Sequence, residues 1–122
     1  MMNLSSNHTM HQLAANFICR KIILGEWKEG ELIPGVQELA SALELNPHIV
    51  GKAMELLAEK NIVNRESEKI NLLADAKQKS MLLLREDFEQ HDLPELMKKM
   101  ELLGLTVSDL SIIISKPTNK VK

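Results

Sequence analysis

The chain has 122 residues and a formal net charge of −2, which is enough for one domain of ordinary size or a compact domain with an appendage, but too short for two independent domains. Hydrophobic residues make up 44% of the sequence, yet it holds two phenylalanines, one tryptophan and no tyrosine, so the core must be aliphatic. A single cysteine, Cys19, excludes an intramolecular disulfide and a thiolate metal cage.

We expect neither a signal peptide nor a membrane span. Residues 1–10 are polar and lack a basic patch followed by an apolar stretch, and the longest uninterrupted apolar run is Met81–Leu84. The cytoplasm is therefore the expected compartment.

The first predicted element is an amphipathic helix over residues 8–24, capped by Ser6 or Asn7 and ended by Gly25. Its apolar positions recur mostly at spacings of three and four: Met10, Leu13, Ala14, Phe17, Ile18, Ile22 and Leu24. Residues 31–34 follow as a small extended piece, because Pro34 disfavours a helix before it.

Two further helices are predicted on either side of a short turn. Residues 36–43 carry apolar side chains at helical spacing, which favours a helix of about two turns. Asn46-Pro47 is a clear start signal for the next helix, with Asn46 as N-cap and Pro47 at the first helical position. That helix is expected to run to about Lys60.

Residues 62–65 and 70–73 are two short β-compatible runs joined by four polar residues, and we expect a hairpin. The order helix, small strand, helix, turn, helix, hairpin is that of a winged helix-turn-helix. The predicted fold is mainly α with a small β-hairpin, with the winged helix-turn-helix over residues 1–75.

Residues 76–116 are predicted to form a helical dimerisation segment. Asp92-Leu93-Pro94 interrupts or kinks its first helix, Gly104 ends the second and Ser108 caps the third. A segment this short cannot form a core of its own. Its apolar stripes must therefore pack on the first domain, on another chain or on both. Pairing of two copies is the economical answer, and the expected interface residues are Met81, Leu84, Phe88, Leu96, Met97, Met100 and Leu103. Residues 117–122 are expected to be a disordered tail.

A resemblance to a known family begins at Gly25–Ala40, which reads GEWKEGELIPGVQELA, and continues through Leu43, Leu45-Asn46-Pro47 and Val50-Gly51-Lys52-Ala53. Over residues 10–73 the chain resembles the GntR family of winged helix-turn-helix regulators, whose consensus there reads roughly G-x-x-x-P-G-x-x-L-P-S-x-R-x-L-A, then L-x-V-N-x-x-T-V-x-x-A. The short helical tail resembles that of the YtrA-like branch. The resemblance implies a dimeric transcription regulator without a large effector-binding domain.

The chain departs from the family pattern where the family contacts DNA. Gly35 and Gln37 stand in place of a serine and an arginine, and Ile49 in place of a threonine. Met54 replaces an aromatic residue, and the wing segment Arg65–Lys69 carries two acids instead of glycines. Gln37 can bond adenine where arginine prefers guanine, so it either alters the sequence preference or marks lost binding.

Nine residues are the candidate DNA contacts, on the second helix, the third helix and the wing. The alternative for the third helix is an ordinary solvated face, and Glu66 and Glu68 could neutralise the two wing cations instead of leaving them for phosphates. The candidates are Gly35, Gln37, Asn46, His48, Ile49, Gly51, Lys52, Arg65 and Lys69.

Charge argues against DNA binding, because residues 1–75 hold seven basic and ten acidic residues. The leading hypothesis is nevertheless a repressor that binds a palindromic operator as a homodimer. The rival is a winged-helix protein-interaction module that has lost specific DNA binding. Which effector, if any, it binds stays unknown.

No enzyme, cofactor or metal is expected. The sequence shows no glycine-rich phosphate loop, no activated nucleophile and no paired carboxylates. His8 and His11 stand one helical turn apart, but nothing nearby in the sequence completes a ligand set. Cys19 is expected to be a small core residue.

Overall fold

The computed structural model describes residues 8–66 and 69–116, and the chain divides into two units after Asp87. The predicted boundary lay at Asp75. The structural division comes later because α4 (Ala76–Asp87) packs against α1 (Met10–Ile23). The predicted disordered tail and the predicted caps Ser6 and Asn7 lie outside the described residues.

Thr9 caps the first helix, α1, so the predicted cap at Ser6 or Asn7 is wrong. The Thr9 hydroxyl accepts a hydrogen bond from the Gln12 backbone N–H (3.2 Å), and the Gln12 side-chain oxygen accepts one from the Thr9 N–H (2.9 Å). This reciprocal capping box satisfies two N–H groups that the first turn leaves without partners. The buried face of α1 consists of Ala14, Ala15, Ile18, Cys19 and Ile22.

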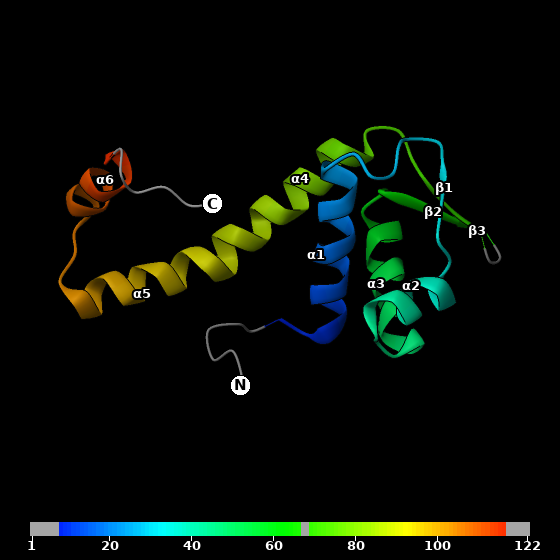
Figure 1. The fold of residues 1–122 in the computed structure, drawn as a ribbon, viewed down its shortest axis with the longest axis horizontal. Coiled ribbons are helices and arrows are strands. Elements are labelled where there is room, and N and C mark those ends of the chain that lie inside the picture. Colours follow the sequence, from blue (N-terminus) through cyan, green and yellow to red (C-terminus); the bar gives the residue numbers. More distant parts are fainter. Residues whose placement is uncertain (1–7, 67–68, 117–122) are drawn as a thin grey trace. The chain divides into compact units, whose positions relative to one another are not determined.

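The helices α2 (Val36–Leu43) and α3 (Pro47–Glu59) begin as the sequence predicts. Glu44 ends α2 in the left-handed conformation, with φ 58°. The Asn46 side chain then accepts a hydrogen bond from the His48 N–H at 2.8 Å. Figure 1 shows α3 beside both α1 and α2, the two helices against which it packs. It buries Val50, Ala53, Met54 and Leu57 against them.

A three-stranded antiparallel sheet completes this unit. It contains β1 (Leu32–Ile33), β2 (Val63–Glu66) and β3 (Lys69–Leu72) in the order β1-β3-β2. The hairpin of β2 and β3 was predicted, whereas the pairing of β1 with β3 adds a strand that the sequence indicated only as an extended piece. The architecture is the predicted winged helix-turn-helix (Figure 1).

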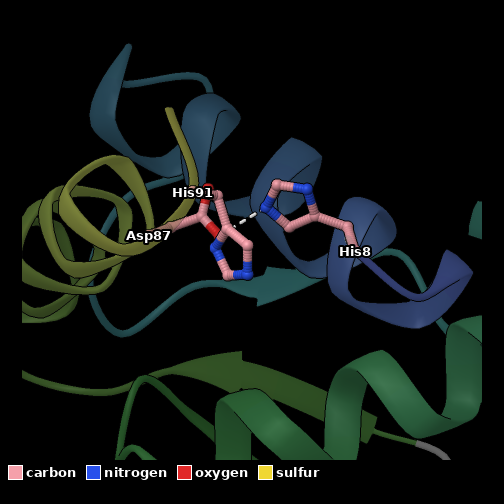
Figure 2. A group of neighbouring side chains, drawn as sticks. All are labelled: His8, Asp87 and His91. Carbon is pink, nitrogen blue, oxygen red and sulfur yellow. Dashed lines mark hydrogen bonds and ion pairs between the residues drawn. The ribbon is translucent and has the colours of Figure 1, made fainter. Parts of the chain in front are cut away.

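Two residues at the start of α1 and within it contact Asp87, the last residue of α4. The Nε2 atom of His8 lies 2.5 Å from an Asp87 carboxylate oxygen, and Figure 2 shows these two side chains facing each other. The Asn16 side-chain amide donates to the other Asp87 oxygen at 3.3 Å. Leu83 and Leu84 pack against the same core, so α4 belongs structurally to the winged helix.

The C-terminal unit contains the π-helical turn η1 (Phe88–Asp92), α5 (Leu93–Leu103) and α6 (Val107–Ser115). Pro94 has no N–H to donate to a preceding carbonyl, which explains why a π turn stands where the sequence predicted an interruption. Gly104 ends α5 with φ 72°, as predicted. Thr106, and not Ser108, caps α6 through a capping box with Asp109.

The C-terminal unit has almost no interior. Between Phe88 and Lys116, the described part of this unit, Met100 is the only buried residue. No helix in the described ranges is long and apolar enough to cross a membrane.

Candidate nucleic-acid interface

The start of α2, the exposed face of α3 and the strand β2 surround a hollow of about 360 Å³, here called the α3 hollow. Proline and valine side chains form part of its wall, but most of its lining is polar or exposes backbone. The lining residues are Val36, Gln37, Pro47, His48, Gly51, Lys52, Glu55 and Arg65.

The α3 side of the hollow is one ridge of the helix. His48, Lys52 and Glu55 follow one another at spacings of four and three residues, so they project from the same face. All three are exposed, while the opposite face of α3 is buried in the core. Core packing on one side thus fixes which side chains the other side presents.

Arg65 comes to the hollow from β2. Its guanidinium donates a hydrogen bond to the Gly51 carbonyl at 3.4 Å. The sequence suggested a wing residue that either holds phosphate or pairs with neighbouring acids, and the structure places it against α3. An additional Cβ at Gly51 would meet nothing within 4 Å, so the surface at this point of the helix is open.

Five of the nine predicted contact residues line the hollow, and four do not. Gln37, His48, Gly51, Lys52 and Arg65 come together there. Gly35 is the N-cap of α2, and the Asn46 side chain is engaged in capping α3. Ile49 is half-buried and packs against the core. Lys69 lies opposite Glu66 in the β2–β3 register.

Glu55 also lines the α3 hollow, although it was not among the contact residues predicted from the sequence. The signal was available, since Glu55 lies one helical turn beyond Gly51 and Lys52 on a helix whose apolar face was already assigned. Together with Lys52 and Arg65 it gives the hollow two cations and one carboxylate. Among residues 8–66 and 69–116, the side chains of Gln37, Lys52 and Glu55 make no hydrogen bond or ion pair.

The predicted dimer residues divide between exposed and internal positions. Leu84 packs on the winged-helix core and Met100 is buried within its own unit. The other five are exposed, at fractions from 37% to 68%: Met81, Phe88, Leu96, Met97 and Leu103. Within the C-terminal unit, α5 and α6 border a largely apolar groove of about 940 Å³, here called the C-terminal groove, whose lining includes Leu96, Met97, Met100 and Leu110.

Cys19, His8 and His11, which the sequence also singled out, lie in the winged-helix unit, away from the lining of the α3 hollow. Cys19 is fully buried, as predicted, and burial raises the pKa of its thiol to about 11, against the smaller lowering effect of the Ser80 side chain. Such a thiol is a poor nucleophile at neutral pH. The ring of His11 lies 3.1 Å from the Thr9 hydroxyl, and His8 pairs with Asp87.

Residues 12–69 match the family model described as bacterial regulatory proteins of the gntR family. No curated protein matches the chain. Among solved structures, the chain is similar to a GntR family transcriptional regulator from Listeria monocytogenes, with 20% identity over 89% of this chain and 95% of the other, and a TM-score of 0.66.

Two other solved structures carry further information in their descriptions. S. agalactiae BusR in complex with its busAB-promotor DNA is 20% identical over 94% of this chain and 59% of BusR, with a TM-score of 0.63. YtrA from Sulfolobus acidocaldarius, a GntR-family transcription factor, is 23% identical over 71% of this chain and 93% of YtrA, with a TM-score of 0.53. At these identities the likeness establishes the fold.

Proposed function

The chain belongs, through residues 12–69, to the GntR family of bacterial regulatory proteins, and we propose that it represses transcription as a homodimer bound to a palindromic operator. The proposal places it in the YtrA-like branch and in the cytoplasm, where its DNA target lies. It requires no cofactor and no catalytic step.

The observation that carries the proposal is the α3 hollow. The exposed ridge of α3 has the geometry of a recognition helix, whose side chains reach base edges in the major groove while flanking elements contact phosphates. Gln37 from α2 and Arg65 from β2 lie beside that ridge. Three elements that are separate in the sequence thus offer polar groups at one surface.

The charge of the hollow also supports DNA as the partner. Residues 1–75 are acidic as a whole, but Lys52 and Arg65 outnumber the single carboxylate among the residues that line the hollow. A locally positive surface can attract phosphates although the net charge is negative. The description of BusR gives promoter DNA as its partner, which agrees with this use of the fold.

Dimerisation is proposed from the exposed apolar side chains of the C-terminal unit. A unit with one buried residue in its described part cannot be stable through its own core. Leu96, Met97 and Leu103 on α5 are exposed, and so are Ile112, Ile113 and Ile114 on α6. Burial of these side chains against a second copy would supply the missing core and give a twofold arrangement of recognition helices.

The test is a titration of the full chain into a labelled duplex from upstream of its own gene, beside a scrambled duplex, at two salt concentrations. Fluorescence anisotropy should show tighter binding to the upstream duplex, and affinity should fall as salt rises. Absence of binding to either duplex would contradict the proposal and favour the protein-interaction module. A search for a protein partner by pull-down would then follow.

A further inference from the structure

Of the eight described residues that line the α3 hollow, Glu55 alone carries a carboxylate. It lies on the same ridge as His48 and Lys52, and the next acid on the helix, Glu59, does not line the hollow. A carboxylate on a surface that approaches DNA repels phosphates, so its presence there calls for a contact with something other than the backbone.

The Glu55 carboxylate is free to make such a contact. Among the described residues it has no hydrogen bond or ion pair, although Lys52 and Arg65 line the same hollow. Arg65 instead donates to the Gly51 carbonyl, which holds its guanidinium on α3. The two cations reduce the repulsion between the carboxylate and nearby phosphates without occupying its oxygens.

The major-groove edges of the four bases differ in what they offer to a carboxylate, which can only accept hydrogen bonds. Guanine presents two acceptors, and thymine an acceptor and a methyl group. Adenine has an amino donor beside the N7 acceptor, which repels a carboxylate, whereas cytosine presents its N4 amino donor without an acceptor. Cytosine is therefore the base edge that fits Glu55.

We propose that Glu55 determines sequence specificity by accepting a hydrogen bond from the N4 amino group of a cytosine in each operator half-site. The inference rests on the proposed DNA-binding function and adds to it a base identity. It assigns the role to a residue outside the nine that the sequence singled out.

The experiment begins with selection of bound duplexes from a randomised library by the full wild-type chain, followed by sequencing. The same selection is made with Glu55→Gln and with Glu59→Gln, a control that removes one carboxylate from the same helix outside the hollow. A glutamine side-chain amide can make two hydrogen bonds with one adenine, accepting from N6 and donating to N7. We therefore expect one half-site position to change from cytosine with the wild type to adenine with Glu55→Gln.

Anisotropy titrations on duplexes that differ only at that position give the magnitude. The wild type and Glu59→Gln should prefer cytosine by about tenfold, and Glu55→Gln should lose or reverse the preference. A wild type that binds specifically but selects the same sequences as Glu55→Gln would overturn the inference and leave the proposed function intact. A uniform gain of affinity in Glu55→Gln would also overturn it, because that result identifies simple repulsion. A wild type that binds no duplex would reject both.

Discussion

His8 and Asp87 are 79 positions apart in the sequence, and the Nε2 atom of one lies 2.5 Å from a carboxylate oxygen of the other. Their side chains are 7% and 20% exposed, so solvent weakens this contact less than it weakens a surface pair. It joins the residue before the cap of α1 to the last residue of α4. The contact thus closes the winged-helix unit at the point where the chain continues into the C-terminal unit.

Replacement of His8 by alanine should therefore lower the free energy of unfolding by roughly 1 to 2 kcal/mol, since it leaves a mostly buried carboxylate with fewer partners. Urea denaturation followed by circular dichroism measures the change. The matched control is His11→Ala, because the His11 ring contacts the exposed Thr9 hydroxyl, and it should change stability by less than about 0.5 kcal/mol. Equal effects of the two substitutions would contradict the structural role of the pair.

Gly51→Ala should raise the stability of the protein and weaken its binding to DNA. Glycine in a helix interior costs roughly 0.5 to 1 kcal/mol relative to alanine, and a Cβ at this position meets nothing within 4 Å. The variant should therefore be more stable to urea by about that amount. If DNA approaches α3 here, the added methyl group should weaken duplex binding in the anisotropy assay. Unchanged affinity would remove Gly51 from the proposed interface.

Lys52→Gln should weaken binding to all duplexes by a similar factor. Removal of one phosphate contact lowers the slope of log affinity against log salt by about 0.9. Titrations at four or more salt concentrations measure this slope. Lys60→Gln, at the C-cap of the same helix, is the control and should retain the wild-type slope. A slope that is the same in wild type and Lys52→Gln would show that Lys52 contacts no phosphate.

The buried thiol of Cys19 predicts a loss of stability in alkaline solution. Burial raises its pKa from 9.0 to about 11, so between these pH values the unfolded chain loses the thiol proton while the folded chain keeps it. The unfolded state then binds fewer protons, and the free energy of unfolding falls as the pH rises through this window, by up to about 3 kcal/mol. Well below pH 9 the thiol is protonated in both states and does not make the free energy of unfolding depend on pH.

Urea denaturation of the wild type and Cys19→Ala at pH 8, 9, 10 and 11 isolates this contribution, because the other titrating groups are common to both proteins. The difference between the two stability curves should narrow as the pH rises above 9. Parallel curves would mean that the thiol titrates alike in the folded and unfolded chains.

Leu103→Asp should shift the proposed dimer toward monomer. Leu103 is 68% exposed at the end of α5, and a carboxylate there would be buried without a partner in a dimer interface. Sedimentation velocity over a range of micromolar concentrations should show at least a tenfold weaker association. Leu24→Asp is a close control, since Leu24 is 72% exposed and also stands at a helix C-terminus. A wild type that sediments as a monomer, or an equal effect of both variants, would contradict the dimer.

The sequence predicted the elements whose signals are local. Asn46 and Pro47 mark the start of α3 because an N-cap and a proline at the first helical position act within one turn. The N-cap of α1 was missed because several polar residues precede the helix, and the choice of Thr9 depends on a side-chain bond from Gln12. The cap of α6 was missed in the same way, since Thr106 competes with Ser108 and has Asp109 as its partner.

The candidate site was less predictable because it depends on contacts between distant segments. Residues 31–34 contain no signal for which strand β1 joins, and the pairing with β3 exists only in the folded sheet. The position of Arg65 on α3 likewise depends on how β2 leaves the helix. The position of Glu55 on the exposed ridge of α3, by contrast, follows from helical spacing alone, so an acidic residue there could have been included among the candidate base contacts.

The order of the sheet also bears on how the molecule avoids self-association through its strands. β2 forms one edge, and three of its four residues, Asn64, Arg65 and Glu66, are exposed. The other edge, β1, is two residues long. Open edges can recruit strands from neighbouring molecules and start aggregates, and charged or very short edges discourage this. The wing can therefore protrude from the protein without becoming a template for intermolecular β-sheet.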